Sequence, residues 1–278
     1  MKHTFFLFYL FMPIMLNAQK GNDIKQGNRK PFVLGEIREI PSAILLEKRT
    51  LNIYLPEGYQ PNDTVKYPVI YLLDGSADED FIHIVGLVQF MNFSWVNVLP
   101  KSILIGIANV DRKRDFSFPT TVEQDKKDFP TTGGSEKFIS FIEQELQPFI
   151  EKNYATNKFK TIIGQSFGGL LATEILFKKP TLFNNYIVIS PSLWWDNESL
   201  LSKNTELLNS NYAQKTAIYI GVGKEGRVME TDAKQLVKKL GNANCLVKTH
   251  FGYFPNENHA TIFHQAVYQA FETLNKAN

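Results

Sequence analysis

The chain of 278 residues carries 30 basic and 28 acidic residues, so its formal net charge is only +2. So small an imbalance gives no support for a nucleic-acid partner or for electrostatic binding to an anionic membrane. Hydrophobic residues make up 44% of the sequence, which is enough for a sizeable core. A chain of this length can hold one large domain or two small ones, and α/β folds often use it for one.

Residues 1–18 have the features of a secretory signal peptide. A cationic start is followed by an apolar stretch over residues 5–16, and cleavage is expected near Ala18 or Gln19. The apolar stretch is shorter than the roughly 20 residues that span a bilayer. We therefore expect an exported protein that has no membrane attachment after cleavage.

Cys245 is the single cysteine of the chain, so no internal disulfide can form. An exported protein without disulfides is more typical of a bacterial periplasm or exterior than of a eukaryotic secretory route. Because Cys245 begins a short apolar run, we expect it to be buried rather than reactive.

The order of the expected elements indicates an α/β fold. Residues 19–30 are polar and are expected to be flexible, and residues 31–278 are expected to form one domain without repeats or linkers. Apolar runs without alternation are typical of strands that helices cover on both faces, and strands alternating with helices predict a mostly parallel sheet. In chain order we expect two or three strands within 31–59, strands at 69–73 and 103–108, a helix at 135–153, a strand at 161–163, a helix at 170–177, strands at 186–189 and 217–222, and helices at 229–240 and 260–274.

A G-x-S-x-G motif lies at residues 164–168, with Ser166 at its centre. An apolar, β-branched run ends at Gly164 and a helical pattern begins just after Ser166. This strand–turn–helix context is that of a nucleophile elbow, in which a tight, strained turn lifts the hydroxyl off the sheet. The two flanking positions approach so closely that both are expected to be glycine. We predict that Ser166 is a catalytic nucleophile.

A serine hydroxyl needs a base, and the base needs a group that orients it. In the α/β-hydrolase arrangement the chain order is serine, acid, histidine. His259, in a polar loop just before the last predicted helix, is the expected base, and His250, at the end of a predicted strand, is the second candidate. His83 precedes the nucleophile and lies in an expected first helix, so it is expected to be structural. His264 falls within the last helix and is expected to be packed or solvated.

The acid is expected in the loop after the 217–222 strand. Glu225 follows this strand directly and can reach the carboxyl edge of the sheet. Glu230 and Asp232 remain alternatives, although a favourable charge in the first turn of a helix is the simpler explanation for both.

A developing oxyanion needs preorganised N–H donors. One donor is expected to be the amide of Phe167, directly after the nucleophile. The other is expected to be the amide of Gly75 or Ser76, in the loop after the first central strand. The histidines and acidic residues lack metal-ligand spacing such as H-E-x-x-H, so neither a metal nor another cofactor is expected.

Six segments occur together in the order of one known family. They are YLLDG at 71–75, RKRDFSFPT at 112–120, GQSFGGLLA at 164–172, SPSLWW at 190–195, VGKE at 222–225 and ENHATIF at 257–263. With them the chain resembles, over roughly residues 35–275, the esterase branch of the α/β-hydrolases that includes esterase D-like, enterochelin-esterase-like and feruloyl-esterase-like enzymes. The resemblance implies an α/β-hydrolase fold and the triad Ser166, Glu225 and His259, although such enzymes vary between Asp and Glu at the acid.

SPSLWW, together with an Arg-rich segment before Phe-Ser-Phe-Pro-Thr, is most similar to the siderophore-ester hydrolases of that family. This resemblance implies that Arg112 or Arg114 meets acidic or catecholate parts of a substrate, and that Trp194 and Trp195 form an aromatic wall. We therefore expect a serine esterase that cleaves a small-molecule ester through an acyl-enzyme, with a catecholate trilactone as one substrate type. Feruloyl or acetyl esters on polysaccharides, acyl transfer and an inactive ligand-binding homologue are the alternatives.

Overall fold

The computed structural model describes residues 28–62, 64–209 and 211–275, so the expected signal peptide lies outside the described residues. The strands and helices given below belong to one compact unit, Leu34–Asn278. Within the described ranges, no helix combines the length and the apolar character needed to cross a bilayer.

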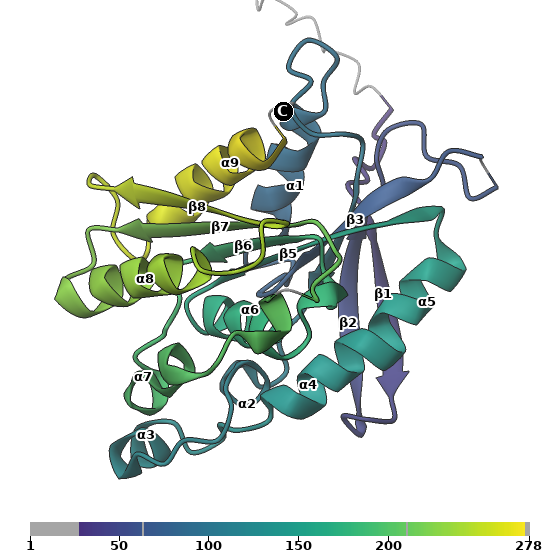
Figure 1. Cartoon of the computed structure of the whole chain (residues 1–278). Helices are drawn as coiled ribbons and strands as arrows, with labels where there is room; N and C mark the ends of the chain where they lie inside the picture. Colours follow the sequence, from purple (N-terminus) through teal and green to yellow (C-terminus); the bar gives the residue numbers. More distant parts are fainter. Residues whose placement is uncertain (1–27, 63, 210, 276–278) are drawn as a thin grey trace, which may run out of the picture. The chain divides into compact units, whose positions relative to one another are not determined.

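An eight-stranded sheet forms the centre of this unit (Figure 1), with the strand order β1-β2-β4-β3-β5-β6-β7-β8. β1, β2 and β4 pair antiparallel, and every later pair of neighbours is parallel. The parallel strands therefore end at one common edge, where ligand sites form in α/β sheets. The strands are β1 (Glu36–Ser42), β2 (Glu47–Tyr54), β3 (Tyr67–Leu72), β4 (Ile103–Ile107), β5 (Thr156–Gln165), β6 (Asn185–Ile189), β7 (Thr216–Gly223) and β8 (Val247–Phe254).

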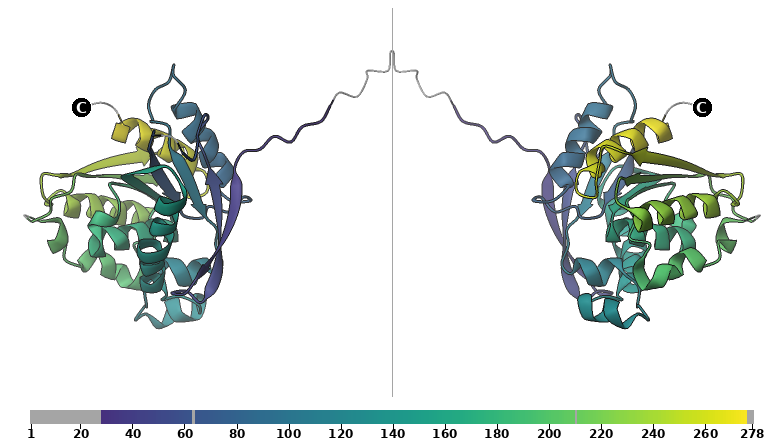
Figure 2. Two further views of the ribbon diagram at one scale, coloured as in Figure 1. Left: turned by 90° about the vertical axis from the view of Figure 1, so that its right-hand side faces the viewer. Right: turned by 90° about the vertical axis from the view of Figure 1, so that its left-hand side faces the viewer.

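Helices cover both faces of the sheet. Successive side chains of a strand point to opposite faces, so the buried residues of the central strands need helices on both sides. Ile70 and Leu72 of β3 pack in one buried cluster with α1 and α9, whereas Tyr71 packs in a second cluster with α4, α5, α6 and α8. In Figure 2 the yellow α9 and the blue α1 accordingly lie on one side, and the yellow-green α8 on the other. The helices are α1 (Phe81–Met91), α2 (Arg112–Phe116), α3 (Glu123–Asp128), α4 (Ser135–Phe141), α5 (Gln147–Asn153), α6 (Phe167–Lys178), α7 (Trp195–Ser202), α8 (Arg227–Leu240) and α9 (Ile262–Asn275), with short turns of other helix types at Ile142–Leu146, Pro180–Leu182 and Glu206–Leu208.

The mostly parallel α/β architecture predicted from the sequence is confirmed. The short helices α2, α3 and α7 were not predicted, and three further local differences occur. The helix expected at 135–153 contains a π-helical turn at Ile142–Leu146 between α4 and α5. β5 is longer than the predicted strand at 161–163. Its first residues are mostly polar and exposed or partly exposed, so the apolar pattern does not indicate them. Cys245 is exposed rather than buried, because it lies in the connection just before β8.

A buried ion cluster fixes α2 against β2. The guanidinium of Arg49 on β2 is fully buried and donates to Asp115 Oδ2 and to Glu47 Oε1, each at 2.7 Å. Arg114 donates to the same two carboxylates, from Nε to Asp115 Oδ1 at 2.7 Å and from Nη2 to Glu47 Oε1 at 2.6 Å. This network holds in place the short helix that begins with Arg112.

Replacing Arg49 with methionine should destabilise the protein strongly. The side chain of Asp115 is only 1% exposed, so loss of Arg49 leaves a buried carboxylate with one partner fewer. We expect a loss of about 3 kcal/mol in the free energy of unfolding, measured by urea denaturation. The control is Lys48→Met, which breaks an exposed pair with Glu39 and should cost less than about 1 kcal/mol. Equal losses for the two variants would contradict the role of the cluster.

Candidate active site

Ser166 lies on a strained turn between β5 and α6, at the carboxyl edge of the sheet. Its backbone has φ 59° and ψ −120°, a conformation that non-glycine residues rarely adopt. A Cβ on Gly164 would come within 2.4 Å of the carbonyl oxygen of Gly168, so position 164 must be glycine. A Cβ on Gly168 would meet only ordinary contacts, the nearest at 3.4 Å, so the expected clash is at one flank and not at both.

The hydroxyl of Ser166 lies 3.2 Å from the hydroxyl of Ser192. Ser192 is buried, and its amide also donates to the carbonyl of Ser166 at 3.0 Å. Ser192 is not among the site residues expected from the sequence. The signal was present, since Ser192 belongs to the SPSLWW segment that carries the family resemblance.

Glu225 and His259 form a close pair beside this turn. Nδ1 of His259 lies 2.6 Å from Oε2 of Glu225, whose side chain is 2% exposed, whereas that of His259 is 47% exposed. The other carboxylate oxygen accepts hydrogen bonds from Ser190 Oγ at 2.5 Å and from the amide of Gly223 at 2.9 Å. Glu225 is therefore fixed by three donors from different elements.

These hydrogen bonds also determine the protonation of Glu225. Burial, the largest single influence, raises the pKa of this carboxyl. The hydrogen bonds from His259, Ser190 and Gly223 together outweigh burial and hold the pKa of Glu225 below its ordinary value. Glu225 is consequently ionised at neutral pH and can stabilise a protonated imidazole.

The alternative acids lie elsewhere. Glu230 accepts a hydrogen bond from the amide of Gly226 at 3.2 Å, at the start of α8. Asp232 is buried on α8, and burial, followed by the nearby charge of Glu198, raises its pKa to about 6. Both side chains thus have helix-associated environments that do not involve His259.

The other histidines also lie outside the cavity at Ser166. His250 is within β8, in register with Tyr219 of β7, rather than at the end of a strand. His83 on α1 and His264 on α9 stack on one another, with 2.5 Å between Nε2 of the first and Nδ1 of the second. Burial and then the charge of His83 lower the pKa of His264. The pair joins two helices that cover the same face of the sheet.

A cavity of about 350 Å³ opens at Ser166. Its lining contains three carboxylates and one guanidinium besides the imidazole, so its charge is more negative than positive. The lining residues are Asp74, Glu79, Asp80, Arg112, Gln165, Ser166 and His259.

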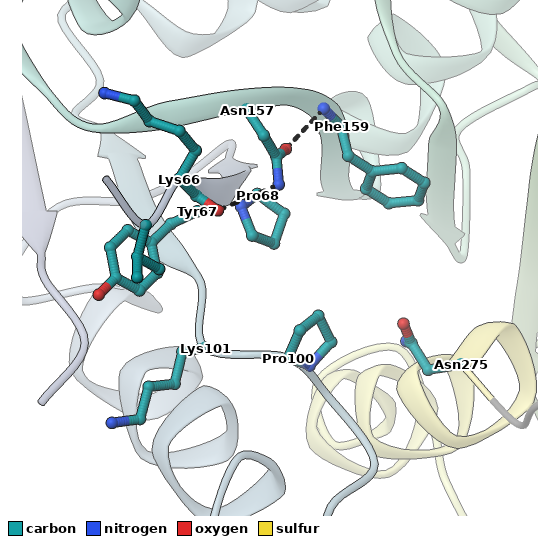
Figure 3. Close-up of a pocket in the computed structure, with 9 residues that line it drawn as sticks. Lys66, Tyr67, Pro68, Pro100, Lys101, Asn157, Phe159 and Asn275 are labelled. Atoms are coloured by element: carbon teal, nitrogen blue, oxygen red, sulfur yellow. Dashed lines mark hydrogen bonds between the residues drawn. The ribbon is translucent and has the colours of Figure 1, made fainter. Parts of the chain in front are cut away.

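A larger cavity of about 710 Å³ lies at the opposite edge of the sheet, near the amino ends of β3, β4 and β5 (Figure 3). Tyr67, Pro68, Pro100 and Phe159 give it largely apolar walls. Its lining has no serine, histidine or carboxylate, so it does not supply the groups of a Ser–His–acid arrangement. The smaller cavity is therefore the candidate active site.

Of the two arginines expected at the site, only Arg112 reaches the cavity. Its Nε donates to Asp74 Oδ1 at 2.6 Å and its Nη2 to Asp74 Oδ2 at 2.9 Å, so a bidentate ion pair compensates its charge. Arg114 is instead held by Glu47 and Asp115 in the ion cluster of α2. Arg114 therefore does not line the cavity as expected, because these two carboxylates hold its side chain in the ion cluster.

The two tryptophans also lie in different surroundings. Trp195 is fully buried, and its indole N–H donates to the carbonyl of Phe118 at 2.8 Å, so it belongs to the core and not to an aromatic wall. Trp194 is partly exposed and packs against the rings of Phe129 and Phe167. Neither indole lines the cavity at Ser166.

The backbone hydrogen bonds reduce the number of candidate oxyanion donors. The amide of Gly75 donates to the carbonyl of Ile107 at 3.0 Å and is therefore engaged in the structure. Ser76 follows directly, and Phe167 is the first residue of α6, where helix amides lack intrahelical acceptors. Ser76 and Phe167 thus remain the candidate donors. The described residues contain no group of three or more histidine, cysteine, aspartate or glutamate side chains that could hold a metal ion.

Comparison with known proteins places the chain in a family. Residues 42–270 match the family model described as "Putative esterase". The chain is 30% identical over 236 residues to the ferri-bacillibactin esterase BesA of Bacillus subtilis, covering 78% of this chain and 81% of that protein. It is 25% identical to the apo-salmochelin esterase of Escherichia coli O6:H1, covering 78% and 73%.

Solved structures agree with this result. An IroE-like serine hydrolase from Shewanella oneidensis superposes with a TM-score of 0.79 at 30% identity, covering 87% of this chain and 80% of that one. The BES protein from Bacillus cereus superposes with a TM-score of 0.78 at 29% identity, covering 91% and 100%. The chain therefore belongs to the "Putative esterase" family and is an ester-hydrolysing enzyme with the α/β-hydrolase fold.

Proposed function

We propose that Ser166, His259 and Glu225 form the catalytic triad of an exported serine esterase that acts through an acyl-enzyme. The observation that carries this proposal is the 2.6 Å contact between His259 Nδ1 and Glu225 Oε2, at a cavity that Ser166 and His259 both line. With Nδ1 held by the carboxylate, Nε2 is the ring nitrogen free to take the proton of the serine hydroxyl.

The reaction proceeds in two stages. Ser166 Oγ attacks the ester carbonyl while His259 takes the hydroxyl proton, and the amides of Phe167 and Ser76 stabilise the oxyanion. The tetrahedral intermediate collapses, His259 gives the proton to the leaving alcohol, and Ser166 carries the acyl group. Water, activated by His259, then attacks this acyl-enzyme and releases the acid. Glu225 stays ionised throughout and stabilises the imidazolium.

Siderophore-type esters are the substrate class that we propose. The names of the relatives, ferri-bacillibactin esterase and apo-salmochelin esterase, support this class. A structure called a ferulic acid esterase shares the fold at a TM-score of 0.62 but only 18% identity, so it supports the fold alone. A catecholate trilactone is therefore the first substrate to test. The sequence of residues 1–18 supports export of the protein.

The charge of the cavity favours the iron-free form of such a trilactone. Arg112 is compensated by Asp74, which leaves the carboxylates of Glu79 and Asp80 on the lining. A ferric tris-catecholate is strongly anionic, whereas the free trilactone carries little charge near neutral pH. Repulsion by Glu79 and Asp80 therefore raises the free energy of the ferric complex more than that of the free ligand.

Ser166→Ala should abolish ester cleavage and leave the fold intact. We expect kcat to fall by roughly three orders of magnitude or more, because the nucleophile is lost. The measurement is product analysis by mass spectrometry on a catecholate trilactone, a feruloylated oligosaccharide and short nitrophenyl esters. Full activity of the variant would refute the mechanism. Cleavage of the feruloylated substrate alone by the wild-type protein would refute the siderophore assignment.

Ser190→Ala should raise the pKa of Glu225. The serine hydroxyl donates to the ionised carboxylate, so its removal destabilises the charged form. In the wild-type protein the lowered pKa of Glu225 stabilises the folded state at pH values above the ordinary pKa of a glutamate. This contribution is lost as the pH falls through the folded-state pKa. We expect a carboxyl ¹³C NMR titration of Glu225 to shift to higher pH in the variant. Ser192→Ala, which leaves the donors of Glu225 in place, should not move it.

The double variant Glu79→Gln/Asp80→Asn should narrow the preference for iron-free over ferric trilactone. At low ionic strength we expect the ratio of the two kcat/KM values to fall by roughly three- to ten-fold, since the repulsion of the anion is removed. Hydrolysis of a neutral nitrophenyl ester should stay the same. The control Glu57→Gln/Glu206→Gln removes two charges outside the cavity lining. An equal effect of both double variants, or a wild-type preference for the ferric form, would contradict the charge argument.

A further inference from the structure

The loop that carries His259 is one of the more exposed parts of the candidate site. Seven residues, 255–261, connect β8 to α9, and the side chain of His259 is 47% exposed. Glu225 holds the ring at Nδ1 only. Proton transfer also requires Nε2 to lie within hydrogen-bond reach of Ser166 Oγ, which depends on where the loop backbone is placed.

A side chain next to the nucleophile holds that backbone. Nε2 of Gln165 donates to the carbonyl oxygen of His259 at 2.5 Å. Gln165 is the last residue of β5, in register with Ile189 of β6, and its own carbonyl accepts from Arg112 Nη2 at 3.2 Å. The glutamine is thus anchored in the sheet at its backbone, and its amide group reaches the loop of the base.

We propose that Gln165, the residue before the nucleophile in the G-x-S-x-G motif, is a positioning residue that fixes the His259 loop relative to Ser166. The proposal rests on the proposed triad. A covalent neighbour of Ser166 thereby ties the loop of the base to the sheet, which keeps the imidazole at a constant separation from the nucleophile. The side-chain amide supplies a donor, which neither a carboxylate nor a thioether of similar length can supply.

The loop has other anchors, so removal of this hydrogen bond should be a local change. The amide of Lys224 donates to the carbonyl of Glu257 at 2.7 Å. Asn258 accepts from the amides of Thr261 and Ile262 at the start of α9. Loss of the Gln165 contact should therefore displace His259 without unfolding residues 255–261.

The test uses Gln165→Glu and Gln165→Met in the mature chain, with a neutral nitrophenyl ester as substrate. We expect kcat to fall by about 10- to 100-fold, because a misplaced base loses this much rate. KM should stay within about two-fold, since a positioning residue acts in the transition state and not in ground-state binding. Amide hydrogen exchange should become faster at residues 256–261, while the midpoint of thermal unfolding stays nearly unchanged.

Gln214→Glu is the matched control, because Gln214 Nε2 also donates to a backbone carbonyl, that of Phe183, at 2.7 Å and outside the cavity lining. It should change neither kcat nor exchange at residues 256–261. The proposal is overturned if the Gln165 variants keep the wild-type kcat, if only KM rises, or if Gln214→Glu has the same effect. If Ser166→Ala is inactive, these outcomes refute only the role of Gln165 and leave the proposed triad in place. An active Ser166→Ala would refute the triad and, with it, this proposal.

Discussion

The site depends on one close approach of two backbone segments, at the turn from β5 into α6. The carbonyl of Gly168 lies where a Cβ of residue 164 would be, so the turn exists only with glycine there. This packing holds Ser166 in its strained conformation and places the first amides of α6 beside the hydroxyl. The positions of the candidate nucleophile, Ser166, and of one candidate oxyanion donor, Phe167, therefore result from a single steric constraint.

Neighbouring parallel strands position Glu225 and His259, and ion pairs position Arg112. Glu225 follows β7 and His259 follows β8, and these adjacent strands end at the same edge, which brings an acid and a base 34 residues apart into contact. The Arg49–Asp115 cluster fixes α2, and α2 presents Arg112 to Asp74 at the cavity. The cavity thereby receives a compensated guanidinium and keeps the carboxylates of Glu79 and Asp80.

The sequence predicts the fold and the pairing of Glu225 with His259 well, since apolar runs, motif spacing and chain order are local signals. It does not predict the partners of long polar side chains, which depend on tertiary contacts. Arg112 and Arg114 are two residues apart, yet one lines the cavity and the other joins a buried cluster. Trp194 and Trp195 are adjacent, yet neither lines the cavity, and Trp195 is buried with its indole N–H bound to the carbonyl of Phe118. The hydrogen bond of Gly75 to Ile107 likewise requires the paired sheet.

The strand order has a consequence for the behaviour of the protein in concentrated solution. β1 ends the sheet on its antiparallel side, and an edge strand can pair with a strand of another molecule and begin aggregation. Exposed charges at Glu36, Arg38 and Glu39 line this strand, and Pro41 lacks the N–H that an added strand would need. The chemistry of β1 itself thus protects this edge against intermolecular strand addition.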